Sequence, residues 1–305
     1  MSSARSLDIP HSSSTVEVSI IDTMFDARLP TGHFMAGKER SILSDLGTPK
    51  DLVNDFPPKV AERVKGMGTM HVEKYVSEIL KENHVPLQCI EAIIWSSILE
   101  IGGLKALDYF GDGSFYLLSA PGHAIRHLNA LARTTEKTFI YLAGYSIHHL
   151  SELRPHPASH LPQYVPLPGR GHCCSGASFH AIHPLTDISN VPNYYHEPLG
   201  YPSSTPDTAP FFTISQKPWV ETLASNIEEA RDTIKAVQRF DADENIFVVA
   251  AHDASTRGIL DLFPNKANDW KLNGLKEKGR WLFLSDFEEA LKVSGTEVGV
   301  GAGTA

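Results

Sequence analysis

Short apolar segments that end in polar residues constrain the fold of this chain more than any other feature. Three of them are followed at once by polar side chains: His123, Tyr145 and His252. An apolar run bounded by turn residues is typical of a buried β-strand. In layered α/β folds, binding and catalytic groups gather just past the carboxyl ends of strands. This order therefore predicts a site built from three strand ends.

The remaining pattern adds a hairpin and two helices. Gly111-Asp112-Gly113 lies between apolar runs over 104–110 and 114–120, and Asp-Gly between such runs is a strong hairpin signal. Apolar residues at helical spacing predict one helix over 72–80 and another over 220–237. Alternating strands and helices indicate the α/β class. Further strands are expected at 14–22, 41–46, 90–95, 138–143 and 246–251, and irregular chain over the rest of 23–57 and over 150–215.

The composition is that of a globular chain and excludes several classes. Hydrophobic residues make up 42% and charged residues 21% of the 305 residues, unlike a disordered, collagenous or disulfide-scaffold protein. Lys and Arg number 27 against 36 Asp and Glu, and the net charge of −9 argues against nucleic acid or an anionic membrane as a partner. No apolar run approaches the roughly 20 residues of a membrane span.

The chain is expected to be one domain in a reducing compartment. Residues 1–14 are Ser-rich and lack the apolar core of a secretory signal, so we expect a flexible segment there. The domain is expected over 15–292, with a flexible Gly-rich tail over 293–305. The three cysteines form an odd set with two adjacent members, which indicates a cytoplasmic protein without structural disulfides.

Histidine is concentrated in the middle of the chain. Ten of the 15 histidines lie between His123 and His196. Imidazole is the commonest metal ligand and titrates near neutral pH, so the cluster suggests a metal or acid–base site. For any single histidine of the cluster, a surface or loop position is the simpler interpretation.

Six segments carry a family resemblance: Ile93–Ser96, Ala106–Leu118, Ala120–His123, His148-His149, Glu152–Pro155 and Ala251–Ser255. Together they resemble a fungal branch of the metallo-β-lactamase superfamily, a branch similar to zinc-dependent acyl-lactone hydrolases. The resemblance extends from about Ser14 to the segment around Trp281. It implies an αββα sandwich with a two-zinc site on one edge. There a metal-bound hydroxide would attack the carbonyl of a lactone, lactam or related ester.

The chain departs from the family pattern where the metal ligands belong. A His-x-His-x-Asp-His motif follows Trp-Ser in the family, whereas Trp95-Ser96 is followed here by Ser-Ile-Leu-Glu, and the motif occurs nowhere else. Several tens of residues are missing at this point, so the sandwich is expected to be incomplete in one half. Tyr145 stands at the position of the bridging aspartate. A neutral phenol with a pKa near 10 cannot replace that carboxylate at neutral pH.

Two metal ligands of the family survive, His123 and His252. A catalytic zinc ion usually takes three protein ligands and a structural one takes four, so two imidazoles are too few. Four neighbours in sequence are candidates to supplement them: His127, His148, His149 and Asp253. We expect that they do not, because the loops of the family are built around other ligands.

Other candidate motifs favour structural roles. His172-Cys173-Cys174 lacks the spaced pairs of a zinc site. Asp112 belongs to the hairpin turn, which explains its place four residues after Asp108. Ser255 lies close to His252, but no G-x-S-x-G elbow is present. No G-x-G-x-x-G or phosphate-binding loop occurs either.

The sequence thus predicts a metallo-β-lactamase-like hydrolase by ancestry that is impaired or inactive as written. Zinc is the cofactor expected for the family, and a small-molecule ester, lactone or lactam is the expected substrate of an active form. One alternative is a non-catalytic pseudoenzyme kept as a binding protein. Others are an incomplete splice or gene-model product of an active hydrolase, and a mononuclear remnant at His123 and His252. The oligomeric state is left open.

Overall fold

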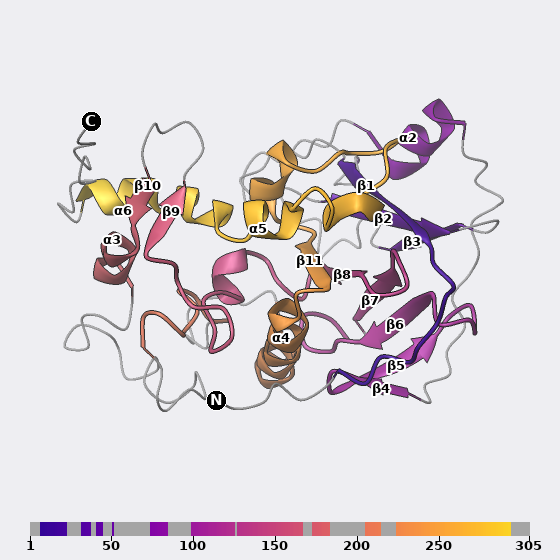
Figure 1. Cartoon of the computed structure of the whole chain (residues 1–305), viewed down its shortest axis with the longest axis horizontal. Coiled ribbons are helices and arrows are strands. Elements are labelled where there is room, and N and C mark those ends of the chain that lie inside the picture. Colours follow the sequence, from indigo (N-terminus) through magenta and orange to yellow (C-terminus); the bar gives the residue numbers. More distant parts are fainter. Residues whose placement is uncertain are drawn as a thin grey trace.

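The computed structural model describes residues 7–22, 32–37, 41–44, 51, 74–84, 99–125, 127–166, 173–183, 205–214 and 224–293. Its main sheet has six strands in the order β11-β8-β7-β6-β5-β4 (Figure 1). Neighbouring strands are antiparallel, except that β11 runs parallel to β8. The strands are β4 (Leu99–Ile101), β5 (Leu104–Asp108), β6 (Phe115–Ser119), β7 (Leu128–Arg133), β8 (Phe139–Gly144) and β11 (Ile246–Ala250).

Two smaller sheets and several short helices complete the described structure. One antiparallel sheet holds β1 (Glu17–Asp22), β2 (Gly32–Gly37) and β3 (Ser41–Ser44), and the other holds β9 (Tyr164–Pro166) and β10 (Cys173–Ser175). The α-helices are α2 (Val76–Glu82), α3 (Gly176–Ala181), α4 (Ile227–Ala242), α5 (Leu275–Gly279) and α6 (Glu288–Val293). The 3-10 helices are η2 (Leu150–Glu152), η4 (Ala254–Gly258), η5 (Asn268–Trp270) and η6 (Leu282–Phe287).

The main sheet is buried on both faces, because successive side chains of a strand point to opposite sides. On one face, Leu117 of β6 belongs to a core that includes Val18 of β1. On the other face, Leu118 belongs to a core that includes Val237 of α4. The main sheet therefore lies between the small sheet that contains β1 and the helix α4. This layering agrees with the expected α/β sandwich.

A buried charged network joins the end of α4 to the loop after η2. The Arg154 guanidinium donates from Nε and Nη2 to the two carboxylate oxygens of Asp241, at 3.0 and 2.7 Å. His156 Nε2 lies 2.9 Å from the same carboxylate, and all three residues are at most 1% exposed. Burial alone would raise the pKa of Asp241, but the Arg154 charge and the hydrogen bonds from His156 and Arg154 hold it well below its usual range.

Most of the predicted elements are present in the described residues. The strands expected at 14–22, 41–46, 138–143 and 246–251 are confirmed as β1, β3, β8 and β11, and the expected hairpin is β5–β6. The helix expected over 72–80 is α2, which begins after Tyr75, whose backbone N–H donates to Glu78 Oε2 at 2.8 Å. The strand expected at 90–95 lies outside the described residues. None of the described helices is long and apolar enough to span a bilayer.

Four expectations about local structure were wrong. The segment 150–215 was expected to be irregular, but η2, β9, β10 and α3 lie in it. The segment 23–57 was expected to hold one strand, but β2 also lies in it and pairs with both β1 and β3. Neither β4 nor β7 was expected as a strand. The helix expected over 220–237 begins at Ile227 and ends at Ala242. Its start is set by Asn226, whose side-chain oxygen accepts the first free backbone N–H groups, those of Glu228 and Glu229.

Candidate functional site

The three strand ends named from the sequence meet at one edge of the main sheet. β6, β8 and β11 point the same way, because β6 and β8 are both antiparallel to β7 and β11 is parallel to β8. The Tyr145 ring stacks on the His123 ring, with centroids 5.4 Å apart, and its centroid lies 4.5 Å from that of His252. The structure therefore brings the two surviving family histidines to one tyrosine. Their role as metal ligands remains a prediction.

His123 is positioned by a turn that packs closely on α4. Gly122 has φ +121°, and a Cβ there would lie 2.1 Å from the backbone nitrogen of Ala230. The Gly122 carbonyl accepts the Asn226 N–H at 2.9 Å, and the His123 carbonyl accepts the Ser225 N–H at 3.0 Å. The start of α4 thus holds the His123 turn in place.

Tyr145 is positioned by the end of β8. Gly144 before it has φ +50°, and its carbonyl accepts the N–H of Ala251 at 3.1 Å. The pairing of β8 and β11 shifts register at this point, where Ala250 pairs with Gly144. Tyr145 directly follows β8 and His252 lies two residues beyond β11, and at this irregularity their rings are in contact.

His148 completes the cluster as a third imidazole. Its ring centroid is 4.8 Å from that of His123 and 5.4 Å from that of His252, and it lies nearly parallel to the His252 ring. Its backbone N–H donates to Glu152 Oε2 at 2.9 Å, which ties it to the last residue of η2. In sequence His148 was only one of four possible supplements, because nothing local shows that the loop after β8 turns back towards His123.

His127 lies beside the cluster, but its two nitrogens are occupied. Ser146 Oγ donates to Asn129 Oδ1 at 2.9 Å, so the hydroxyl oxygen can accept from His127 Nδ1, which lies 3.3 Å away. His127 Nε2 then accepts the backbone N–H of Tyr145 at 3.3 Å. This imidazole therefore supports the backbone around Tyr145.

His149 and Asp253 are also engaged in local structure. His149 Nδ1 accepts the backbone N–H of Ser151, and its Nε2 lies 3.0 Å from Asp286 Oδ2. Asp253 Oδ1 caps η4 by accepting the backbone N–H of Ser255 at 3.0 Å, and it also accepts the Ser255 hydroxyl hydrogen. Burial raises the pKa of Asp253. The Ser255 hydroxyl thus donates to a carboxylate that caps a helix. This structural role agrees with the sequence-based expectation that Ser255 is not a catalytic nucleophile.

Burial favours the neutral form of three imidazoles at this sheet edge, those of His123, His127 and His148. Burial lowers the pKa of His123, and it lowers the pKa of His127 to about 4, with a further contribution from the neighbouring His123. Burial and the nearby His123 and His252 lower the pKa of His148 to about 3. A general base works best when its pKa lies near the operating pH. The His127 and His148 imidazoles, whose pKa values lie well below neutral pH, are therefore weak bases for activating water without a metal.

The donors present do not fit a dinuclear metal centre. His123 Nδ1 and His148 Nε2 are buried and have no hydrogen-bond partner within the described ranges, so each could face a ligand. Yet no three His, Cys, Asp or Glu side chains of the described residues are placed to hold a metal ion. Tyr145, which the family resemblance sets at the bridging position, has a phenol and no carboxylate, and the Asp253 carboxylate caps η4.

The other sequence candidates have structural roles or lie elsewhere. Asp108 accepts the backbone N–H groups of Gly111 and Gly113, and Asp112 accepts that of Ser114, so both carboxylates stabilise the hairpin turn. Cys173 and Cys174 lie in β10. His172 is outside the described residues.

Comparison with known proteins identifies relatives that align with most of the chain, although no protein-family model matches it. Gamma-lactamase FDB1 of Fusarium pseudograminearum is 31% identical over an alignment that covers 92% of this chain and 84% of FDB1. Metallo-hydrolase mfmC of Annulohypoxylon moriforme is 37% identical, over 70% of this chain and 51% of its own length. A solved N-acyl homoserine lactone lactonase aligns with a TM-score of 0.41, 14% identity, and coverage of 84% of this chain and 99% of the lactonase.

The FDB1 alignment also bears on the missing segment. It extends over 371 residues, more than the 305 residues of this chain, so FDB1 contains residues without a counterpart here. The family resemblance read from the sequence is confirmed by these relatives. The chain belongs to the metallo-β-lactamase superfamily.

Proposed function

We propose that this chain is a hydrolase-family protein without a working dinuclear zinc centre, and that it is impaired or inactive in opening lactones, lactams and related esters. The observation that carries the proposal is the place of Tyr145. Its ring stacks on His123 and contacts His252, the two ligands that the family pattern leaves in this chain. These contacts support the proposal that a phenol takes the position where the family has a bridging carboxylate.

Two further observations support this proposal. The His-x-His-x-Asp-His motif is absent from the sequence, and the FDB1 alignment is longer than the chain. When bound, the family's zinc ions would polarise a carbonyl and supply a metal-bound hydroxide. Without such ions, His123, Tyr145, His148 and His252 form a group of packed rings at the sheet edge.

The setting proposed for this protein is the cytoplasm. The three cysteines include the adjacent pair Cys173-Cys174, and an odd set of this kind suits a reducing compartment.

The proposal is tested by metal content and turnover of the purified chain. Zinc per chain is measured by mass spectrometry after dialysis, and hydrolysis of a γ-lactone and a γ-lactam is followed with FDB1 run in parallel. We expect well under one zinc ion per chain and no turnover above buffer. The same zinc content is expected for His252→Ala, because that side chain holds no metal under the proposal.

Two other results of the same measurements would contradict the proposal. About two zinc ions per chain, or turnover comparable with that of FDB1, would overturn the proposal. A single zinc ion that is lost in His252→Ala, with hydrolysis lost at the same time, would establish the mononuclear alternative instead.

A further inference from the structure

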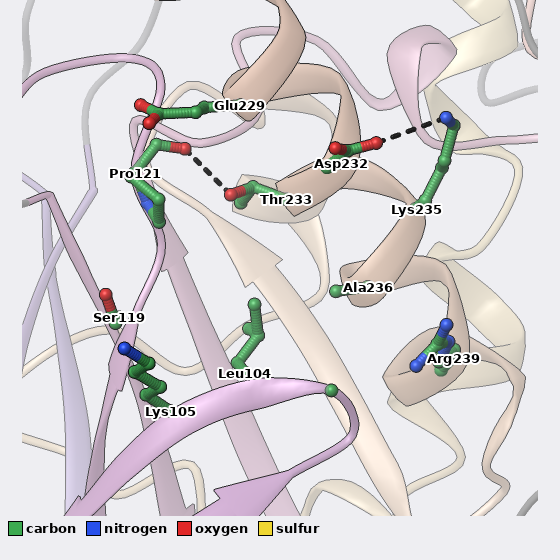
Figure 2. A pocket seen from close by; sticks show the side chains of 11 residues that line it. Leu104, Lys105, Ser119, Pro121, Glu229, Asp232, Thr233, Lys235, Ala236 and Arg239 are labelled. Atoms are coloured by element: carbon green, nitrogen blue, oxygen red, sulfur yellow. Dashed lines mark hydrogen bonds and ion pairs between the residues drawn. The ribbon is translucent and has the colours of Figure 1, made fainter. Parts of the chain in front are cut away.

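A second candidate site lies away from the histidine cluster, between α4 and the edge of the main sheet. A cavity of about 520 Å³ opens there between β5, the end of β6 and the length of α4 from Glu229 to Arg239 (Figure 2). Cavities of roughly 300–1,000 Å³ are typical of small-molecule sites. The residues that line this cavity do not include the histidine cluster, so a ligand bound here is independent of the proposed function.

Charged side chains of both signs line the cavity. Lys105, Arg239 and Glu229 form no ion pair with any other residue in the described part of the chain, whereas Asp232 and Lys235 pair with each other at 3.2 Å. The pair is close to neutral as a unit. The cavity therefore presents two positive charges and one negative charge to a ligand.

The two positive side chains come from different elements, Lys105 from β5 and Arg239 from α4. Arg239 Nη1 donates to the Gly102 carbonyl at 3.3 Å. A Cβ at Gly103, where φ is +86°, would lie 2.5 Å from that nitrogen, so glycine leaves room for the guanidinium. The register that pairs Ala106 with Leu118 places Lys105 beside the Ser119 end of β6.

The negative side chain, Glu229, lies near Pro121 (Figure 2). In this view Lys105 lies on the same side of Leu104 as Glu229, and Arg239 lies on the other side, beyond Ala236. The Thr233 hydroxyl donates to the Pro121 carbonyl at 2.8 Å, which fixes this part of the cavity against α4. The apolar Leu104 and Ala236 side chains also line the cavity. A ligand that satisfies all of these groups is short, with an apolar middle and charges at its ends.

We propose that this cavity binds a small amino dicarboxylic acid. Its two carboxylates would pair with Lys105 and Arg239, its ammonium group would pair with Glu229, and its short carbon chain would lie against Leu104 and Ala236. The ligand neutralises the three charges that have no ion-pair partner among the described residues. Because all three side chains are exposed, the attraction is screened by salt and each pair contributes modestly.

The test is a calorimetric titration at low salt with three probes of similar length: L-glutamate, glutarate and 4-aminobutyrate. We expect saturable glutamate binding, with glutarate and 4-aminobutyrate each about two- to fivefold weaker, because each lacks one charged group. Lys105→Gln and Arg239→Gln should each weaken glutamate binding about two- to fivefold. Glu229→Gln should remove the preference for glutamate over glutarate.

Lys137→Gln is the matched control, because Lys137 is an exposed lysine in the turn between β7 and β8, outside the cavity. It should leave all three affinities unchanged. Absence of saturable glutamate binding at millimolar concentration would overturn the proposal. So would glutamate binding that Lys105→Gln, Arg239→Gln and Glu229→Gln leave equal to that of the control.

Discussion

Replacing Asp241 by asparagine should strongly destabilise the fold. Asp241 is fully buried and accepts two hydrogen bonds from the Arg154 guanidinium, at 3.0 and 2.7 Å. Asparagine has nearly the same shape, but it carries no charge and offers one acceptor oxygen in place of two. The Arg154 cation, 1% exposed, would then remain buried without its counter-charge.

The size of the effect follows from that burial. Removing one partner of a buried ion pair typically costs about 3–5 kcal/mol in the free energy of unfolding. The free energy of unfolding of a domain of this kind is about 5–15 kcal/mol in total, so Asp241→Asn should remove a large share of it. At about 2–4 °C per kcal/mol, the melting temperature should fall by roughly 6–20 °C.

The assay is urea unfolding followed by circular dichroism, with Glu17→Gln as the control. Glu17 and Lys266 form an ion pair in which both side chains are more than half exposed. Its loss should cost about 0–1 kcal/mol. If Asp241→Asn lowered the unfolding free energy no more than Glu17→Gln, the buried network would not stabilise the fold as argued.

The same pair predicts a direction for acid sensitivity. The pKa of Asp241 is held well below its usual range in the folded state. Its stabilising contribution is therefore complete above the unfolded carboxyl pKa of about 3.9, and it is lost as the pH falls through the lower folded pKa. Asp241→Asn should remove that part of the acid dependence, which urea unfolding at a series of pH values would measure.

Two further predictions concern the histidine cluster. In histidine side-chain NMR, the His127 and His148 rings, with pKa values of about 4 and 3, should stay neutral from pH 8 to 5. Because these folded-state pKa values lie below the histidine pKa of about 6.5 in the unfolded chain, the stabilising contribution of the two buried neutral rings is present above pH 6.5 and declines below it. Titration of either ring near pH 6.5 would contradict the burial argument. Gly122→Ala should lower the melting temperature and shift the His123 signals, because the added Cβ meets the Ala230 backbone nitrogen; an unchanged melting curve would show that the turn can move away from α4.

Local sequence patterns were sufficient where one strand face is apolar and a turn residue marks the end. The β5–β6 hairpin follows from Asp112-Gly113 between apolar runs, and β8 and β11 follow from continuous apolar segments. In contrast, β7 has polar residues in buried positions and shows no strand pattern. Asn129 donates to the Tyr141 hydroxyl at 2.8 Å, and Arg133 Nε donates to the Gly113 carbonyl at 2.8 Å. These partners come from distant parts of the chain, so no local pattern could show that the two side chains are buried.

For the candidate site, too, some features followed from the sequence and others only from the tertiary structure. The amino-acid order alone determined that His123, Tyr145 and His252 follow strands, and that the family's leading metal motif is absent. Only the tertiary structure decided that His148 joins them and that His127 and His149 are engaged elsewhere. The physical reason is that a strand fixes the direction of its own side chains over a few residues. Which imidazoles face one another depends on how loops return to the sheet edge and on which donors and acceptors they meet there.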